Sequence, residues 1–147
     1  MKRIPKYDIV KTGFITPLVG EGEPLTGPQK AVEILRTMIV DEARENVAVL
    51  ALNARRVVIG AQIVSTGTLT QSLAHPREVF RMAIQLNAAA VVVGHNHPSG
   101  DPTPSPDDNA LTRRLREAAE ILGIPLVDHV IVAENETYSY AAHGWNR

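Results

Sequence analysis

The sequence predicts an α/β (α+β) protein, a single domain in which a mixed β-sheet is flanked by helices. Apolar residues recur at helical spacing in some segments and form short runs in others, in the order helix, two strands, helix, strand, helix, two strands. With 147 residues, 44% of them hydrophobic and 21% charged, the chain can bury one core of ordinary globular composition. Because no internal repeat is visible, this order favours one sheet with helices packed on it.

The chain divides into an N-terminal extension, 1–25, and a domain, 26–147. The extension is rich in Gly and Pro, and its apolar pairs Ile9-Val10 and Phe14-Ile15 predict a short strand. Thr26 followed by Gln29 indicates the start of a helix with Thr26 as its N-cap. The apolar stripe that follows extends this helix to about residue 44.

The later elements follow from the same two periodicities. Strands are predicted at 47–52, 57–65, 90–94, 126–132 and 137–141, and helices at 76–87 and 106–122. Asn53-Ala54-Arg55-Arg56 indicates a hairpin between the first two strands, and Gly123 marks the end of the last helix. In the middle helix, the residues expected to face inward are Val79, Phe80, Ala83, Ile84 and Leu86.

Two histidines and an aspartate mark the candidate site. His95 and His97 follow the apolar run 90–94, and side chains two residues apart in a strand point the same way, so the two imidazoles can converge. Asp108 begins the next helix, after a loop stiffened by Pro98, Pro102, Pro104 and Pro106. Two imidazoles and a carboxylate leave a fourth position open, which is typical of a catalytic zinc site. The sequence thus predicts Zn²⁺ held by His95, His97 and Asp108.

Two other interpretations of these residues stay open. Ser105-Pro106-Asp107-Asp108 is a good helix start, so Ser105 and Asp108 could form only a capping box. The histidines could be polar loop residues that hold no metal. Capping alone leaves the histidines unexplained, and a helix N-terminus favours the ionised carboxylate that metal binding needs, so capping and metal binding can coexist.

The spacing His-x-His-x7-Ser-x2-Asp, formed here by His95, His97, Ser105 and Asp108, resembles the motif of JAB/MPN (JAMM) metallopeptidase domains. The run His-Asn-His-Pro-Ser-Gly-Asp-Pro-Thr-Pro-Ser from His95 is similar to the RadC branch of that superfamily, as are the segments at 65–69, 75–80, 87–90 and 128–132. The resemblance implies the JAB/MPN fold, which is cytidine-deaminase-like, for 26–147. RadC-type chains usually carry a helix-hairpin-helix module ahead of this domain, and we expect none in 1–25.

The resemblance also implies roles for further residues. A glutamate upstream acts as general base in JAMM domains; Glu45 is the best match, with Glu42 as the alternative, and the competing interpretation of Glu45 is a plain surface carboxylate. Ser105 would donate its hydroxyl to the oxygen that becomes negative during the reaction, in competition with its role as an N-cap. Neighbouring Asp128 and His129 lie within a strand and face opposite sides of the sheet, which indicates structural or supporting roles.

Composition excludes several classes of protein. The absence of Cys excludes disulfides, thiolate ligands and the zinc deaminases, which need a Pro-Cys-x-x-Cys segment. A net charge of −1 does not require a nucleic-acid partner. No apolar run reaches membrane-spanning length, and the basic start Met1–Lys6 is not followed by the apolar region of a signal peptide. We therefore expect a cytoplasmic protein without a membrane partner.

The function expected from these observations is that of a zinc-dependent hydrolase of the JAMM type, a metalloprotease acting on an amide or isopeptide bond of a protein or peptide-like substrate. A connection with DNA repair is implied only by the RadC label. The alternative is a non-catalytic MPN-type domain that binds protein or assists DNA processing. The sequence is compatible with a homo-oligomer.

Overall fold

The computed structural model describes residues 22–39, 43–67 and 74–145, together with the backbone of two short strands, β1 (Tyr7–Ile9) and β2 (Ile15–Pro17). These strands continue one sheet in the order β1-β2-β4-β3-β5-β6-β7. The other strands are β3 (Glu45–Leu52), β4 (Val58–Gly67), β5 (Ala90–Asn96), β6 (Leu126–Val132) and β7 (Thr137–Ser139). Because β5 and β6 are parallel and the other paired strands are antiparallel, the sheet is mixed, which confirms the predicted fold class.

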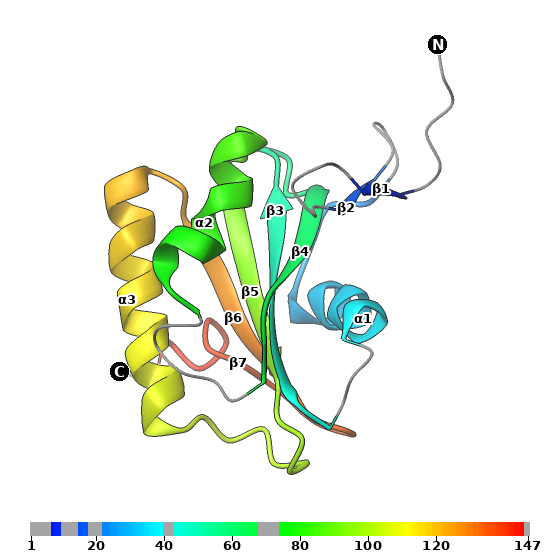
Figure 1. The fold of residues 1–147 in the computed structure, drawn as a ribbon, viewed down its shortest axis with the longest axis vertical. Coiled ribbons are helices and arrows are strands. Elements are labelled where there is room, and N and C mark those ends of the chain that lie inside the picture. Colours follow the sequence, from blue (N-terminus) through cyan, green and yellow to red (C-terminus); the bar gives the residue numbers. More distant parts are fainter. Residues whose placement is uncertain (1–6, 10–14, 18–21, 40–42, 68–73, 146–147) are drawn as a thin grey trace.

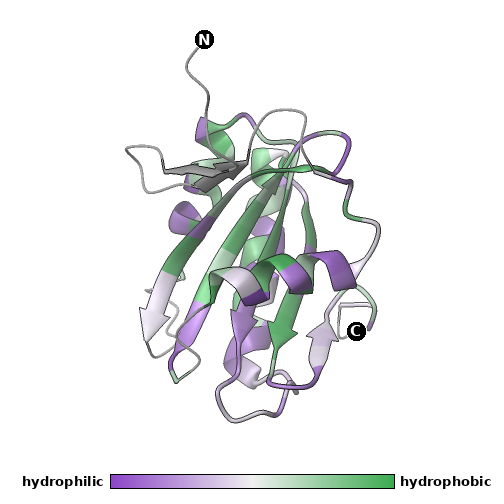
Figure 2. Cartoon of the chain, turned by 90° about the vertical axis from the view of Figure 1, so that its right-hand side faces the viewer, coloured by the Kyte–Doolittle hydropathy of each residue, from purple (hydrophilic) through white to green (hydrophobic). Residues whose placement is uncertain are grey.

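Helices cover both faces of the sheet (Figure 1). α1 (Pro28–Met38) lies on one face, and α2 (Pro76–Gln85) and α3 (Pro106–Leu122) lie on the other. The alternation of β3 divides its side chains between the two cores: Val47 and Val49 pack toward α2 and α3, whereas Ala48 and Leu50 pack toward α1. The central strands are accordingly hydrophobic along much of their length (Figure 2).

α1 packs closely against β5 at Gly94. A Cβ atom built on Gly94 would meet the side chain of Leu35, which is fully buried, at a distance that real Cβ atoms do not reach. The absence of a side chain at this position lets the helix lie directly on the strand that carries the two histidines. This contact therefore helps to position the end of β5.

The ends of α1 and the buried face of α2 differ from the sequence predictions. The N-cap of α1 is Gly27 without a side-chain hydrogen bond, so the prediction of Thr26 as cap is wrong, and the helix ends at Met38 rather than near residue 44. Ile84 in α2 is 56% exposed and Met82 is buried in its place, because the face of α2 that meets the sheet is rotated from the one we expected. His75 is the N-cap of α2, its Nδ1 accepting the Arg77 N–H.

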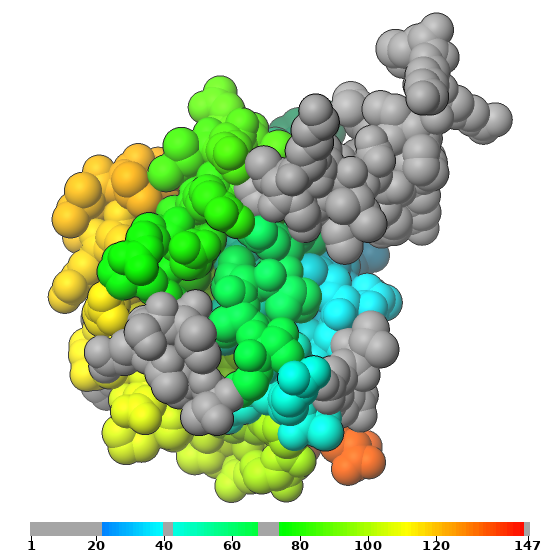
Figure 3. Space-filling model, in the orientation of Figure 1, coloured from blue at the N-terminus to red at the C-terminus, as the bar shows by residue number. Residues whose placement is uncertain are grey.

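The connection from β5 through α3 to β6 brings the candidate site together. The loop after β5 lies at the lower end of the molecule beside the start of β3, as the space-filling view shows (Figure 3). α3 then returns along the sheet and ends at Gly123, whose φ of 69° gives the left-handed conformation that glycine adopts readily. No helix among the described residues has the length and apolarity needed to cross a membrane.

Candidate metal centre

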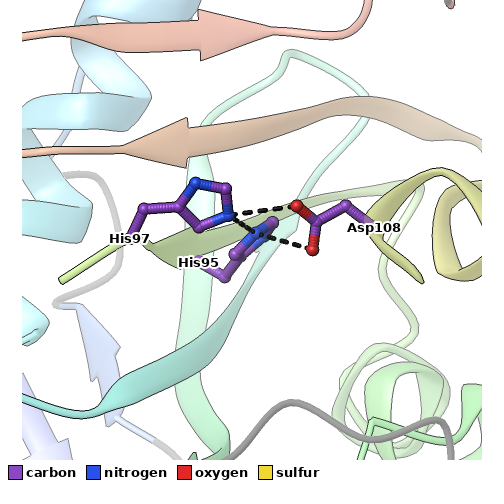
Figure 4. Close-up of side chains that lie close together, drawn as sticks. All are labelled: His95, His97 and Asp108. Atoms are coloured by element: carbon purple, nitrogen blue, oxygen red, sulfur yellow. Dashed lines mark hydrogen bonds and ion pairs between the residues drawn. The ribbon is translucent and has the colours of Figure 1, made fainter. Parts of the chain in front are cut away.

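His95 and His97 lie at the carboxyl end of β5, on the face of the sheet that α3 covers. His95 is fully buried, and its Nε2 is 3.0 Å from Nε2 of His97. The alternation of the strand brings the two rings to the same side, as predicted. Figure 4 shows both rings directed toward the carboxylate of Asp108.

Asp108 reaches the histidines from the first turn of α3. Its N–H donates to Oγ of Ser105 (3.1 Å), and its Oδ2 accepts the Ser105 N–H (2.9 Å), which makes a complete capping box. The same carboxylate places Oδ1 3.2 Å from His95 Nε2 and Oδ2 3.0 Å from His97 Nε2. Capping and the approach to the histidines therefore coexist, and the interpretation of a capping box alone does not describe this site.

The three side chains together could hold a metal ion. For zinc bonds of about 2.0–2.1 Å in a tetrahedral arrangement, two ligand atoms are about 3.3 Å apart. The two Nε2 atoms are 3.0 Å apart, and each lies close to a different Asp108 oxygen, His97 Nε2 3.0 Å from Oδ2 and His95 Nε2 3.2 Å from Oδ1, so the donor atoms are close enough together to surround an ion of this size. The ligand chemistry of imidazole and carboxylate is also that of zinc sites.

The outer nitrogen of each histidine is held by the protein. His97 Nδ1 is 2.8 Å from the carbonyl oxygen of Asp101, which can only accept, so Nδ1 carries the proton and Nε2 of the neutral ring keeps its lone pair for a cation. His95 Nδ1 is 2.7 Å from Nε2 of His129 on β6. The sequence indicated a supporting role for His129, but not that it would contact His95.

Charge at the centre is balanced between Asp108 and His97. Burial would raise the pKa of Asp108, but the hydrogen bonds from His95 and His97 outweigh it and hold that pKa well below the ordinary range. The hydrogen bond to Asp108 raises the pKa of His97. Complete burial lowers the pKa of His129 well below that of an ordinary histidine. The ionised form of Asp108 is thus favoured, and so is a cation beside it, whether proton or metal.

Glu45 is the first residue of β3 and lies on the same face of the sheet as the histidines. Val47 pairs with His95 in the antiparallel register, which places Glu45 opposite His97 two positions further on. Its carboxylate adds to the rise in the pKa of His97, after the larger effects of Asp108 and the Asp101 carbonyl. Glu42, the alternative base, lies outside the described residues.

Asn96, between the two histidines, fixes the start of β3. Its side chain points to the opposite face, where Oδ1 accepts the Asn46 N–H at 2.6 Å and Nδ2 donates to the Arg44 carbonyl at 2.9 Å. These two bonds hold the backbone on both sides of Glu45 against the end of β5. Asn96 was not among the residues predicted from the sequence, although an amide side chain that alternates with two ligands at the end of an otherwise apolar strand was a signal for it.

Ser105 is the N-cap of α3, as the sequence predicted. Its Oγ accepts the Asp108 N–H, which uses a lone pair and leaves the hydroxyl proton available for donation. The expected competition between capping and donation to a substrate oxygen therefore does not arise. Between the ligands, the loop is held by Gly100 N–H donating to the His97 carbonyl at 3.1 Å and Thr103 N–H donating to Asp101 Oδ1 at 2.9 Å.

Comparison with known sequences agrees with this geometry. Residues 25–145 match the family model described as the RadC-like JAB domain. The chain belongs to the RadC-like JAB domain family. It is 48% identical over 122 residues to a protein of Thermotoga maritima named UPF0758 protein, a match that covers 83% of this chain and 54% of that one. A protein of the same name from Pelobacter propionicus is 45% identical over 119 residues, covering 81% of this chain and 52% of its own. The chain spans about half the length of the curated relatives it matches.

Proposed function

We propose that this RadC-like JAB domain is a zinc-dependent hydrolase of the JAMM type that cleaves an amide or isopeptide bond in a protein or peptide-like substrate. The observation that supports this most directly is the convergence of His95 Nε2, His97 Nε2 and the Asp108 carboxylate at ligand-to-ligand distances that suit zinc. A bound zinc ion supplies Lewis acidity and lowers the pKa of a water molecule toward about 7.

The protein's own residues would carry the protons of this reaction. Glu45 lies across from His97 on the face of the sheet that carries the ligands, and this position supports the proposal. It would take a proton from the attacking water as a general base and then deliver it to the leaving nitrogen as a general acid. The Ser105 hydroxyl, whose oxygen already accepts the Asp108 N–H, can donate its proton to the oxygen that becomes negative in the tetrahedral intermediate.

Metal analysis tests the proposal. Protein purified without chelators should contain about one zinc per chain, and His95→Ala and Asp108→Ala should each lose it. His143→Ala is the matched control, because His143 is an exposed histidine that stacks on Tyr138 and does not belong to the candidate ligand group. Full zinc content in both ligand variants would refute the metal assignment.

The substrate can be sought with Glu45→Gln, which should keep zinc and the fold while trapping bound protein partners. Zinc binding without any turnover that depends on Glu45 would favour the alternative of a non-catalytic protein-binding or DNA-processing accessory domain.

A further inference from the structure

A chain of three hydrogen bonds leads from the candidate ligand His95 into the core between β6 and α3. His95 Nδ1 is 2.7 Å from His129 Nε2, and His129 Nδ1 is 2.6 Å from Oγ1 of Thr112. Thr112 Oγ1 is 2.8 Å from the carbonyl oxygen of Asp108, one helical turn before it. The His129 ring is fully buried and stacks on Tyr140, with centroids 5.0 Å apart, so it has little freedom to turn.

The protons of this chain can be ordered in two ways. In the first, Thr112 donates to the Asp108 carbonyl, His129 Nδ1–H donates to Thr112, and His95 Nδ1–H donates to His129 Nε2. A buried imidazole stays neutral and carries one proton, so each step follows from the previous one. The first order leaves the lone pair of His95 Nε2 directed at His97 and Asp108.

In the second order the two hydrogen bonds of His129 are reversed, and the Thr112 hydroxyl no longer donates to the Asp108 carbonyl, which can only accept. Thr112 donates to His129 Nδ1, His129 Nε2–H donates to His95 Nδ1, and the proton of His95 is on Nε2, where it faces Asp108 Oδ1 at 3.2 Å. A proton at that nitrogen occupies the position of a metal ion. Metal binding by neutral His95 is therefore compatible with the first order alone.

We propose that His129 is a positioning residue of the metal centre: Thr112 accepts a hydrogen bond from His129 Nδ1–H, which leaves His129 Nε2 to accept one from His95 Nδ1–H and so commits Nε2 of His95 to the metal. This inference rests on the proposed metal site and adds to it residues from β6 and the second turn of α3. For His97, the acceptor that holds the Nδ1 proton is the backbone carbonyl of Asp101. For His95, which lies deeper in the fold, the acceptor is the buried side chain of His129.

Zinc affinity in matched variants tests this proposal, measured by competition with a chromophoric chelator. His129→Phe keeps a flat ring but offers no acceptor, and we expect zinc affinity to fall about 10- to 100-fold. His129→Gln restores an oxygen acceptor and should recover most of the loss. Thr112→Val keeps the side-chain shape without the hydroxyl and should weaken binding less than His129→Phe.

Asp128→Asn is the control for general damage to β6. Asp128 is adjacent to His129 and buried, but it faces the other side of the sheet, where it accepts hydrogen bonds from Ser139 and from the Ala141 N–H. This variant can lose stability, yet its zinc affinity should equal that of the wild type. Circular dichroism of each variant shows whether it is folded.

Long-range ¹H–¹⁵N spectra of the histidine rings give a readout that a purely structural role would not change. In the zinc-loaded wild type, Nδ1 of both His95 and His129 should be protonated, and Nε2 of His129 should have the shift of an acceptor. A proton on His129 Nε2 in the zinc-loaded protein, or a folded His129→Phe with wild-type zinc affinity, would overturn the inference while leaving the metal site intact. Absence of zinc binding by the wild type would instead overturn the proposed function.

Discussion

Replacing Asp108 with Asn should destabilise the metal-free protein through the loss of one charged partner. The side chain of Asp108 is nearly inaccessible and its Oδ2 is 3.0 Å from His97 Nε2. Asn keeps an oxygen that can accept the Ser105 N–H, so the cap is largely preserved and the loss is mainly that of the charged hydrogen bond. Such bonds contribute about 1.5–3 kcal/mol, and for a protein of this size a loss of about 2 kcal/mol lowers Tm by roughly 4–8 °C.

The difference between wild type and Asp108→Asn should depend on pH in a definite direction. The hydrogen bond to Asp108 raises the pKa of His97, so its contribution is fully present below the unfolded histidine pKa of about 6.5 and is lost as the pH rises through the raised value. The pKa of Asp108 is lowered, so its contribution is present above about pH 4 and is lost only as the pH falls through the lowered value. The difference in Tm should therefore be largest between about pH 4 and 6.5.

Thermal unfolding followed by circular dichroism, in the presence of a chelator and at a series of pH values, measures this difference. Asp107→Asn is the matched control, because it removes an exposed acidic charge from the same helical turn without touching the histidines. A Tm difference for Asp108→Asn that is the same at pH 5.5 and pH 9, or no larger than that of Asp107→Asn, would refute the assignment of an Asp108–His97 ion pair.

Further changes test the other parts of the site and fold. Glu45→Gln should keep zinc but lower turnover about 10²- to 10⁴-fold in a peptidase assay, and wild-type turnover would exclude Glu45 as the base. Ser105→Ala should cost about 1 kcal/mol through the lost cap, measured by denaturant titration, and should also slow turnover; an unchanged rate would leave Ser105 with capping alone. Gly94→Ala should cost about 1–3 kcal/mol, because its Cβ would overlap Leu35, and an unchanged Tm would contradict that contact. As the pH is lowered from 8, zinc affinity should begin to fall before the pH reaches about 6.5, because the raised pKa of His97 lets protons compete for this ligand earlier than at an ordinary histidine. A constant affinity from pH 8 to pH 5 would contradict this.

The convergence of His95, His97 and Asp108 was predictable because it depends on local rules. The alternation of a strand fixes the direction of two side chains, and the cap of a helix fixes the place of the third. Strand β6 was predicted with its observed bounds, since Gly123 and Pro125 come just before it and the polar segment 134–136 follows soon after it. The mixed sheet followed from the order of the elements.

The contact between His129 and His95 could not be predicted, because it depends on a register that no local pattern specifies. Val93 of β5 pairs with His129 in the parallel register, which brings His129 diagonally next to His95 on the same face. The error at Ile84 has a similar origin: several rotations of α2 bury an apolar stripe, and contacts with the sheet select one of them. The N-cap of α1 was misplaced because Pro28 fits the first helical position after Gly27 without any side-chain cap.

The loop between His97 and Asp108 makes the candidate centre a preorganised chelate. Its prolines, Pro98, Pro102, Pro104 and Pro106, restrict the backbone, and its own turn bonds tie Gly100 and Thr103 back to the loop. The loop then loses little conformational entropy when an ion binds to both His97 and Asp108. We expect the empty and loaded forms to share one backbone arrangement, so that an ion removed by a chelator can be replaced without unfolding the chain.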